Sequence, residues 1–463
     1  MAFHGPVTIS RTTRNLAVAS IVAVLTLAAC GDDNDTATEP TDPGPASTEP
    51  TVSAELQGEI TEICAPDRYA ATPPLDGTPE RVTELLAFLK EAGASTPPLD
   101  SLEVPPELQP GFDLVLEAAG SATDALEAAE DAAAAGDMAL ADRQIRRHEA
   151  HLWSITGRFA LMGARCGAAD PDRANGADLN VPLDLHGEQL NTGFGSVWVS
   201  QKYGDNVVRI DPDSGEILAT IPVGTDPLKL QPADGRMWVR TADAYVAIDE
   251  ATNTVADSLA KADVGPAANR SFAIDGAMWI CDGRRLHRYD PTTLEPVTAI
   301  DLGVPCDFVY ATPDLVMTWN DDDAPAESGA SATVMIDPAT NQVLATISLP
   351  VDVVWPAVFD DTVFFAGDLN TSAVVIDRDT WSVASTIELP DVVGGGGITT
   401  DGRSIFVPTR GEEPWDVLVL DAETFEHVDT IEPLSVNGVV AEDGALWLVH
   451  PDTNVLQRFD VQR

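Results

Sequence analysis

The sequence has very few basic residues. Its 463 residues include 26 lysines and arginines against 75 aspartates and glutamates, which gives a formal charge of −49. Lysine occurs only at Lys90, Lys202, Lys229 and Lys261. Because nucleic-acid binding rests largely on lysine and arginine that neutralise phosphates, we expect no nucleic-acid partner. We interpret the acidity as a solubility feature rather than as a means of recruiting a cationic ligand.

Cysteine is also scarce, with five residues. No CxxC motif and no cysteine–histidine cluster is present, so the sequence gives no zinc site. We expect no metal and no cofactor, and we assign no residue a catalytic role. Four cysteines form two pairs by region, Cys64 with Cys166 and Cys281 with Cys306. An exported protein meets oxidising conditions, so we predict a disulfide in each pair.

No apolar run reaches the about 20 residues that a membrane-spanning helix needs. The run from Leu16 to Ala29 follows Arg11 and Arg14, and a basic start before a short apolar core describes an export signal. The end of this run, Leu27-Ala28-Ala29-Cys30, resembles the lipobox of bacterial lipoproteins. That resemblance implies cleavage before Cys30 and acylation of Cys30. The alternative is an ordinary signal peptide with a coincidental cysteine.

An acylated Cys30 implies a protein anchored to membrane lipid on the extracytoplasmic face, since two or more acyl chains anchor stably. Residues 1–29 are therefore assigned to a lipoprotein signal peptide. Residues 30–52 are rich in Asp, Thr, Pro, Ser and Glu with almost no large apolar residue. Such a segment cannot bury enough surface to offset its ordering entropy, and we predict a flexible tether.

Residues 53–170 have a helical pattern. Thr78-Pro79-Glu80 is typical of a helix start. The clearest helix begins at Asp137, and its apolar stripe recurs at steps of three and four residues up to Cys166. We predict a small four-helix bundle, in which Cys64 ends the first helix and Cys166 ends the last. His148 lies on the stripe, and we interpret it as a packed core histidine rather than as a metal ligand.

Residues 178–463 carry an internal repeat. The stretch Arg209 to Glu216 contains an apolar residue, an aspartate and a turn, and the same pattern recurs six times. Its aspartates are Asp211, Asp249, Asp290, Asp337, Asp377, Asp421 and Asp460, at intervals of 38, 41, 47, 40, 44 and 39 residues. A period near forty with strand-like alternation is typical of β-propeller blades. The repeat therefore predicts a multidomain protein, α plus all-β, in which a seven-bladed propeller follows the helices.

The last repeat stops after its third strand, at Phe459-Asp460. We predict that the segment Asn180 to Leu185 supplies the missing fourth strand. One N-terminal strand and three C-terminal strands would then close the ring and remove exposed sheet edges.

The repeats, with Gly-x-x-Trp segments such as Gly235 to Trp238, resemble the YVTN-repeat (YncE-like, WD40-like) seven-bladed propellers over residues 177–463. That resemblance implies an exported binding or scaffold module. Virginiamycin B lyase and quinoprotein dehydrogenases are neighbouring propeller families. The lyase would need a histidine base beside acidic metal ligands, and only His186 and His450 fall on the loop face. The tryptophan-docking repeat of the quinoproteins is absent.

The loops that join second to third strands and fourth to first strands share one face of such a ring, which we call the mouth. Basic residues gathered there would make a positive funnel in an acidic chain, and tryptophans could line a pocket. The candidate ligand-binding residues are Lys202, Lys229, Arg240, Arg270, Arg284, Trp319, Trp355 and Arg410. The competing interpretation is that the cations pair with nearby acids.

Two further mouth segments leave alternatives open. The insertion from Asn320 to Ala332 is either a binding loop or a tolerated insertion, and we interpret its run Asp321 to Asp323 as a solvated acidic loop. The glycines Gly394 to Gly397 lack the ending of a phosphate-binding loop. For the whole chain we expect a binding or interaction module with a small-molecule or protein partner at the mouth. The alternatives are an extracytoplasmic lyase or hydrolase and a scaffold that assembles a complex through its outer blade edges.

Overall fold

The structure is a computed structural model. It describes residues 52–64, 78–95, 99–167, 169–265, 272–320, 332–394, 397–411, 415–450 and 452–461. The expected signal peptide, and the expected tether up to residue 51, lie outside these ranges. Among the described residues, no helix is both long enough and apolar enough to cross a membrane.

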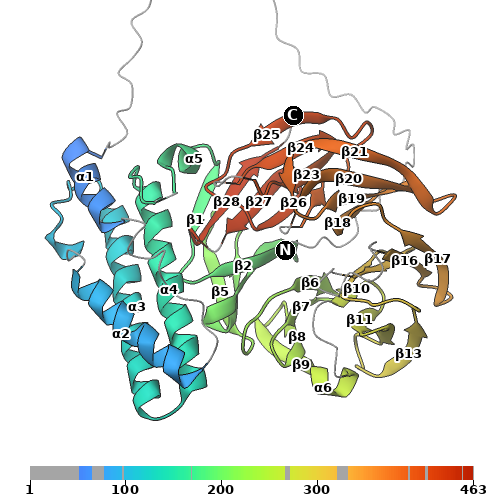
Figure 1. The fold of residues 1–463 in the computed structure, drawn as a ribbon, viewed down its shortest axis with the longest axis horizontal. Coiled ribbons are helices and arrows are strands. Elements are labelled where there is room, and N and C mark those ends of the chain that lie inside the picture. The colour runs from blue at the N-terminus through green and yellow to red at the C-terminus, as the bar shows by residue number, and fades with distance from the viewer. Residues whose placement is uncertain are drawn as a thin grey trace, which may run out of the picture.

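Helices occupy the N-terminal part of the described chain. They are α1 (Ala54–Ile63), α2 (Pro79–Ser95), the short 3₁₀ helix η2 (Leu99–Ser101), α3 (Gln109–Ala134) and α4 (Met138–Leu161). Ser53 caps α1 by accepting from the Leu56 amide at 3.1 Å, and Asp137 caps α4 through the Leu140 amide at 3.0 Å. Apolar clusters join α3 and α4 to α1 at one end and to α2 at the other. Figure 1 shows these helices side by side, next to the strands.

The last long helix ends earlier than the stripe predicts. It stops at Leu161, and Gly163 follows in a left-handed conformation with φ of +83°. Glycine reaches this conformation without the cost that a side chain imposes, so the chain turns and Cys166 lies beyond the helix. The segment between the predicted helical part and the predicted propeller contains one helical turn, α5 (Pro171–Asn175).

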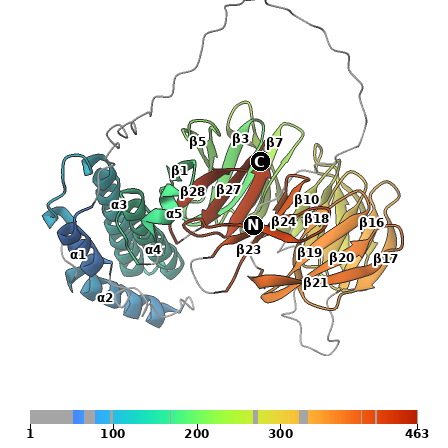
Figure 2. The ribbon, with the colours of Figure 1, turned by 90° about the horizontal axis from the view of Figure 1, so that it is seen from above.

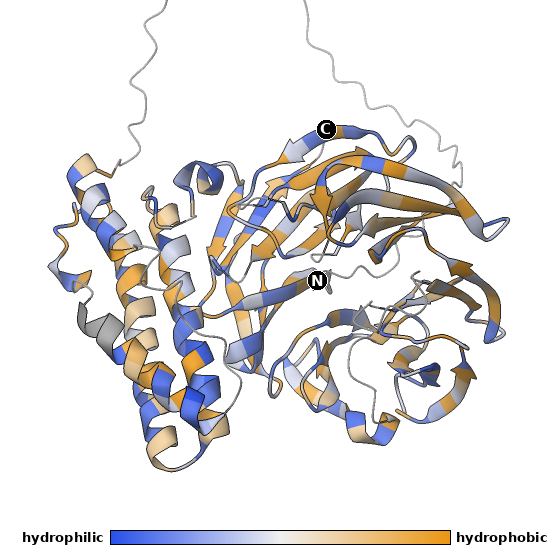
Figure 3. Cartoon of the chain, viewed as in Figure 1, coloured by the Kyte–Doolittle hydropathy of each residue, from blue (hydrophilic) through white to orange (hydrophobic). Residues whose placement is uncertain are grey.

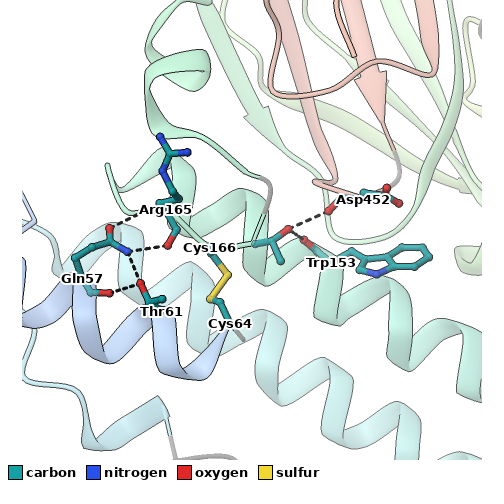
Figure 4. The surroundings of a disulfide bond; sticks show 8 residues. Gln57, Thr61, Cys64, Trp153, Arg165, Cys166 and Asp452 are labelled. Carbon is teal, nitrogen blue, oxygen red and sulfur yellow. Dashed lines mark hydrogen bonds between the residues drawn. A yellow bond between two sulfur atoms is a disulfide. The ribbon is translucent and has the colours of Figure 1, made fainter. Parts of the chain in front are cut away.

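Both predicted disulfides are present. The helical disulfide joins Cys64 and Cys166, whose Cα atoms are 5.3 Å apart. Next to it, Gln57 binds the backbone of Arg165 twice, at 2.8 and 2.9 Å (Figure 4). The rim disulfide joins Cys281 and Cys306.

The described strands form seven four-stranded antiparallel sheets, arranged as a seven-bladed propeller (Figure 1). Blades 1 to 3 are β2 (Gly187–Gly193), β3 (Ser196–Gln201), β4 (Asn206–Ile210), β5 (Ile217–Pro222); β6 (Leu230–Ala233), β7 (Arg236–Arg240), β8 (Ala244–Asp249), β9 (Thr254–Ala260); and β10 (Phe272–Ile274), β11 (Met278–Asp282), β12 (Arg285–Tyr289), β13 (Pro296–Asp301). Blades 4 to 6 are β14 (Phe308–Ala311), β15 (Val316–Trp319), β16 (Ala332–Asp337), β17 (Gln342–Ser348); β18 (Val353–Val358), β19 (Thr362–Gly367), β20 (Asn370–Asp377), β21 (Ser382–Val393); and β22 (Thr399–Thr400), β23 (Ser404–Pro408), β24 (Val417–Asp421), β25 (His427–Ile431). Short helices η3 (Lys202–Gly204) and α6 (Lys261–Val264) lie in the connections.

The seventh sheet contains strands from both ends of the propeller sequence. Its order is β1 (Leu179–Pro182), β28 (Val455–Asp460), β27 (Ala445–His450) and β26 (Gly438–Glu442). Figure 2 shows β1 beside β28 and β27, close to the helices. Because β1 directly follows α5, this sheet lies next to the helical part of the chain.

In blades 1 to 6 the repeated aspartate forms the turn between the third and fourth strands. Asp211 Oδ1 accepts from the amides of Asp213 and Ser214, at 3.1 and 2.8 Å. The same turn geometry recurs at other blades, for example at Asp290 and Asp421. An Asp side chain that accepts from amides two and three residues ahead stabilises a turn, so these aspartates are architectural.

A tryptophan–arginine pair joins neighbouring blades. Trp198 is buried, and the Arg209 guanidinium lies 4.9 Å from its ring centroid. Arg209 then donates to Glu250 O and to Asn253 Oδ1 in the next blade. Arg288 makes the same kind of link from blade 3 to blade 4. Figure 3 shows hydrophobic residues along the propeller strands, interspersed with hydrophilic ones.

Candidate functional site at the propeller mouth

The channel behind the mouth contains a buried lysine. Lys229 precedes β6 in blade 2 and is 3% exposed. Its Nζ donates to Val309 O in blade 4 at 3.3 Å. The same nitrogen lies 5.4 Å from the ring centroids of Phe272 in blade 3 and Trp355 in blade 5. One side chain thus reaches from blade 2 to inner strands of three other blades, which places its ammonium group among the inner strands that line the channel.

Burial, together with repulsion from Arg240, holds the pKa of Lys229 well below its ordinary value. Arg240 ends β7 and is half-buried, and burial also lowers the pKa of its guanidinium. Asp226 and Glu188 oppose that decrease. Acidic and basic groups from blades 1 and 2 therefore interact electrostatically around one side of the channel.

Glu188 and His186 form a close pair beside the channel. His186 Nε2 lies 2.6 Å from Glu188 Oε2. Burial would raise the pKa of Glu188, but the hydrogen bond and charge of His186, with the charge of Lys202, bring it to about 2. The His186 ring lies between Trp153 of α4, at 5.5 Å, and Tyr203 of η3, at 4.8 Å. The pair is therefore covered from the helical side.

Arg410 connects blades 6 and 7 at the mouth. Its Nε donates to Gly394 O at 3.1 Å and its Nη2 donates to Asn437 Oδ1 at 2.8 Å. The guanidinium lies 3.9 Å from the ring centroid of Trp415. Asn437 in turn donates to Glu188 O at 3.2 Å, so hydrogen bonds run from blade 6 through blade 7 to blade 1.

The structure brings some of the predicted residues together and separates others. Lys229 and Trp355 meet in the channel. Trp319 is 1% exposed and packs at 5.2 Å against Trp355, so it supports that ring from within the core. Arg284 is exposed in the turn between β11 and β12. Arg270 lies outside the described residues.

Helix α4 forms one edge of the mouth, which the sequence reasoning missed. Its residues 147–158 contact residues 183–186, 202–205 and 452–454 of the propeller, and we call this contact the docking seam. Asn454, 1% exposed, donates to Ala150 O and Ser154 Oγ, both at 2.8 Å. Thr156 donates to Asp452 O at 2.9 Å (Figure 4), and Arg147 Nε donates to Tyr203 O at 2.8 Å.

A sequence signal for the docking seam existed. On the α4 surface away from the predicted apolar stripe, Ala150, Ser154 and Gly157 are small residues spaced three and four apart. Small residues at this spacing let another backbone approach a helix closely. The structure places the turn between β27 and β28 against them.

The described residues hold no group of three or more His, Cys, Asp or Glu side chains that could bind one metal ion. The run Asp321 to Asp323 lies outside the described residues, as do the side chain of His450 and the central glycines of Gly394 to Gly397.

Comparisons with known proteins concern the fold. No protein-family model matches the chain, and no curated protein matches it. A chain in the crystal structure of the mitotic checkpoint complex matches 62% of this chain and 92% of its own length, with 10% identity and a TM-score of 0.50. Kuenenia stuttgartiensis hydrazine synthase (61% and 98% covered) and a streptogramin B lyase (60% and 96%) each have 14% identity and a TM-score of 0.48. The chain is a seven-bladed β-propeller preceded by helices, and its similarity to these proteins is one of fold alone.

Proposed function

We propose that this protein is a membrane-anchored extracytoplasmic binding protein whose propeller mouth recognises a small polar or anionic ligand or a protein partner. The observation that carries the proposal is the convergence of Lys229, Arg240 and Arg410 around the channel of a chain whose formal charge is −49. Cations gathered at one opening raise the local concentration of anions. Trp415 is half-buried, lies against Arg410 and gives the mouth the aromatic surface that ligand pockets favour, while Trp355 lies buried beside Lys229.

Removing positive charge at the mouth tests this proposal. Arg240→Gln and Arg410→Gln keep side-chain volume and remove the charge, whereas Arg236→Gln removes a charge from the opposite end of the same strand as Arg240. We expect ligands found by thermal-shift screening of polar and anionic compounds to bind the two mouth variants at least about tenfold more weakly. The Arg236 variant should bind as the wild type does. Equal affinity in all four proteins would contradict the proposal.

Membrane anchoring forms the second part of the proposal and rests on the lipobox resemblance at Cys30. We propose residues 1–29 as signal peptide, 30–52 as tether, 53–170 as helical domain and 178–463 as YVTN-like propeller. Cys30→Ser should move the protein from the membrane fraction to the soluble extracytoplasmic fraction and abolish incorporation of labelled palmitate. If the variant still incorporates palmitate, lipidation occurs elsewhere and this assignment is wrong.

The alternative is an enzyme of lyase or hydrolase type, and the His186–Glu188 pair favours it. A histidine within hydrogen-bond distance of a carboxylate is the arrangement that acid–base catalysis uses. However, Nε2 already contacts Glu188, and Nδ1 is buried with no hydrogen-bond partner among the described residues. His186 is 5% exposed and its ring lies against Trp153 and Tyr203, so a substrate would have to displace these side chains to reach it. Carbethoxylation of His186 as fast as that of the exposed His427 would support the enzyme, and protection of His186 would support the binding protein.

A further inference from the structure

The N-terminal half of α4 extends past the docking seam and over the mouth loops of blades 1 and 2. Arg143 Nη1 lies 3.7 Å from Asp205 Oδ2, and Arg147 Nη2 lies 3.9 Å from the same oxygen. Asp205 follows η3 in the loop between β3 and β4. Two guanidinium groups of the helix therefore share one carboxylate oxygen of the propeller, and neither approaches it within 3.5 Å.

Asp226, in the loop between β5 and β6, belongs to the same cluster. Burial raises the pKa of its carboxyl group, and repulsion from Asp205 adds to that increase. Lys202, Arg143 and Arg146 act in the opposite direction. These opposing effects show that cations of α4 and of blade 1 lie around the same propeller carboxylates.

Two cationic side chains in this cluster make no hydrogen bond to the rest of the described chain. The Arg143 side chain makes no hydrogen bond within the described ranges, and it is 37% exposed. The Lys202 side chain makes neither a hydrogen bond nor an ion pair with any residue that the structure describes, and its Nζ lies 5.5 Å from the ring of Tyr203. Arg146, by contrast, is bonded to Asp142 at 3.0 Å. Arg143 and Lys202 therefore present unused donors from opposite sides of the contact between helix and propeller.

The docking seam fixes the position of these donors. Arg147 binds Tyr203 O next to Lys202, and Asn454 holds α4 two turns further along. A guanidinium fork and an ammonium group held on separate rigid elements suit an oxygen anion, because each makes charge-assisted hydrogen bonds to a phosphate or carboxylate.

We propose that Arg143 of α4 and Lys202 of blade 1 form a composite oxyanion site that binds a phosphate or carboxylate group of a small molecule. The site deepens the proposed function, on which it rests, since it places the anionic part of the ligand between the helical segment and the propeller. The helical segment then contributes to ligand recognition as well as to spacing from the membrane.

Titration calorimetry at constant ionic strength tests the site with two probes, inorganic phosphate and malonate, which distinguish a tetrahedral from a planar anion. We expect saturable binding of at least one probe to the wild-type protein. Arg143→Gln and Lys202→Gln should each weaken it by about tenfold, as expected for loss of one charge-assisted hydrogen bond. The matched control is Arg81→Gln, which removes a half-buried arginine of α2 that is paired with Glu84. Arg143→Lys should recover part of the affinity because it restores the charge without the fork.

Two results overturn the inference. One is the absence of saturable binding of both anions to the wild type, which leaves the proposed function standing because that function also allows a polar ligand or a protein partner. The other is equal affinity in the wild type and the Arg143 and Lys202 variants. If only Arg240→Gln and Arg410→Gln then weaken binding, the ligand lies in the channel and the composite site is wrong. Melting curves of each variant exclude loss of folding as the cause.

Discussion

Gly157 offers the sharpest test of how the helical segment meets the propeller. It lies in α4 opposite the turn between β27 and β28. A methyl group at this position would overlap the carbonyl oxygen of Thr453 and approach Val455 Cγ2 to 2.9 Å. Because the overlapped atom belongs to backbone, it cannot rotate away. Gly157→Ala should therefore push α4 off the propeller.

The expected loss can be worked out from the docking seam. Withdrawal of α4 weakens the two hydrogen bonds of Asn454 and the bond from Thr156 to Asp452. Each such bond contributes about 1 kcal/mol net, so losing the three bonds would cost about 3 kcal/mol of stability. Alanine in place of glycine within a helix stabilises that helix by about 0.5–1 kcal/mol. We expect a net destabilisation of about 2 kcal/mol.

Gly120 supplies the matched control. It lies within α3, and a methyl group there would meet nothing within 4 Å. Gly120→Ala should stabilise the protein by about 0.5–1 kcal/mol through helix propensity alone. Urea unfolding gives the stabilities, and hydrogen exchange of amides in residues 147–158 reports whether the docking seam opens. If Gly157→Ala raises the urea midpoint as Gly120→Ala does, α4 is not held against the propeller as described.

Three other perturbations have definite expected outcomes. Arg209→Ala removes hydrogen bonds to the next blade and should destabilise the propeller by about 2–3 kcal/mol in a urea titration. Arg236→Ala breaks one half-exposed ion pair and should destabilise it by at most about 1 kcal/mol in the same titration. Replacing both cysteines of the helical disulfide by serine should lower the free energy of unfolding by about 1 kcal/mol more than the same change in the rim disulfide, because the cross-linked residues are 102 positions apart instead of 25. Equal losses of stability in the two variants would contradict the chain-entropy argument. Burial, reinforced by the charges of neighbouring arginines, lowers the pKa of His151 from 6.5 to about 4. Between pH 6.5 and 4 the unfolded state therefore binds more protons than the folded state, and the free energy of unfolding should fall as the pH drops through this range. His151→Leu should reduce this slope in urea titrations at stepped pH, and an unchanged slope would show that His151 is not the group responsible.

The sequence was sufficient for the parts of the fold that repeat or obey local rules. The spacing of Asp211 and its equivalents counts the blades because in blades 1 to 6 this aspartate stabilises the same turn with nearby backbone amides. Asp137 fixes the start of α4 because its side chain accepts from an amide only three residues ahead. The cysteine pairs followed from their few possible partners by region.

The mouth could be predicted only in part. The order of strands in each repeat assigned Lys202, Lys229, Arg240 and Arg410 to one face, because all loops that join the same two strands of an antiparallel blade lie on the same side of the ring. It could not show that Lys229 turns into the channel toward blade 4. It likewise could not show that Trp319 points into the core while Arg284 points to solvent. Such directions depend on how neighbouring blades are rotated and packed, which local pattern does not encode.

The sequence by itself thus determined the period of the propeller and the helical segment that precedes it, since these depend on residues near one another in the chain. Only the tertiary structure decided that α4 completes the mouth. That contact joins residues about 300 positions apart, Ser154 and Asn454, and depends on a glycine small enough for two backbones to touch. Complementarity between distant surfaces arises after each has folded, so neither surface shows it alone.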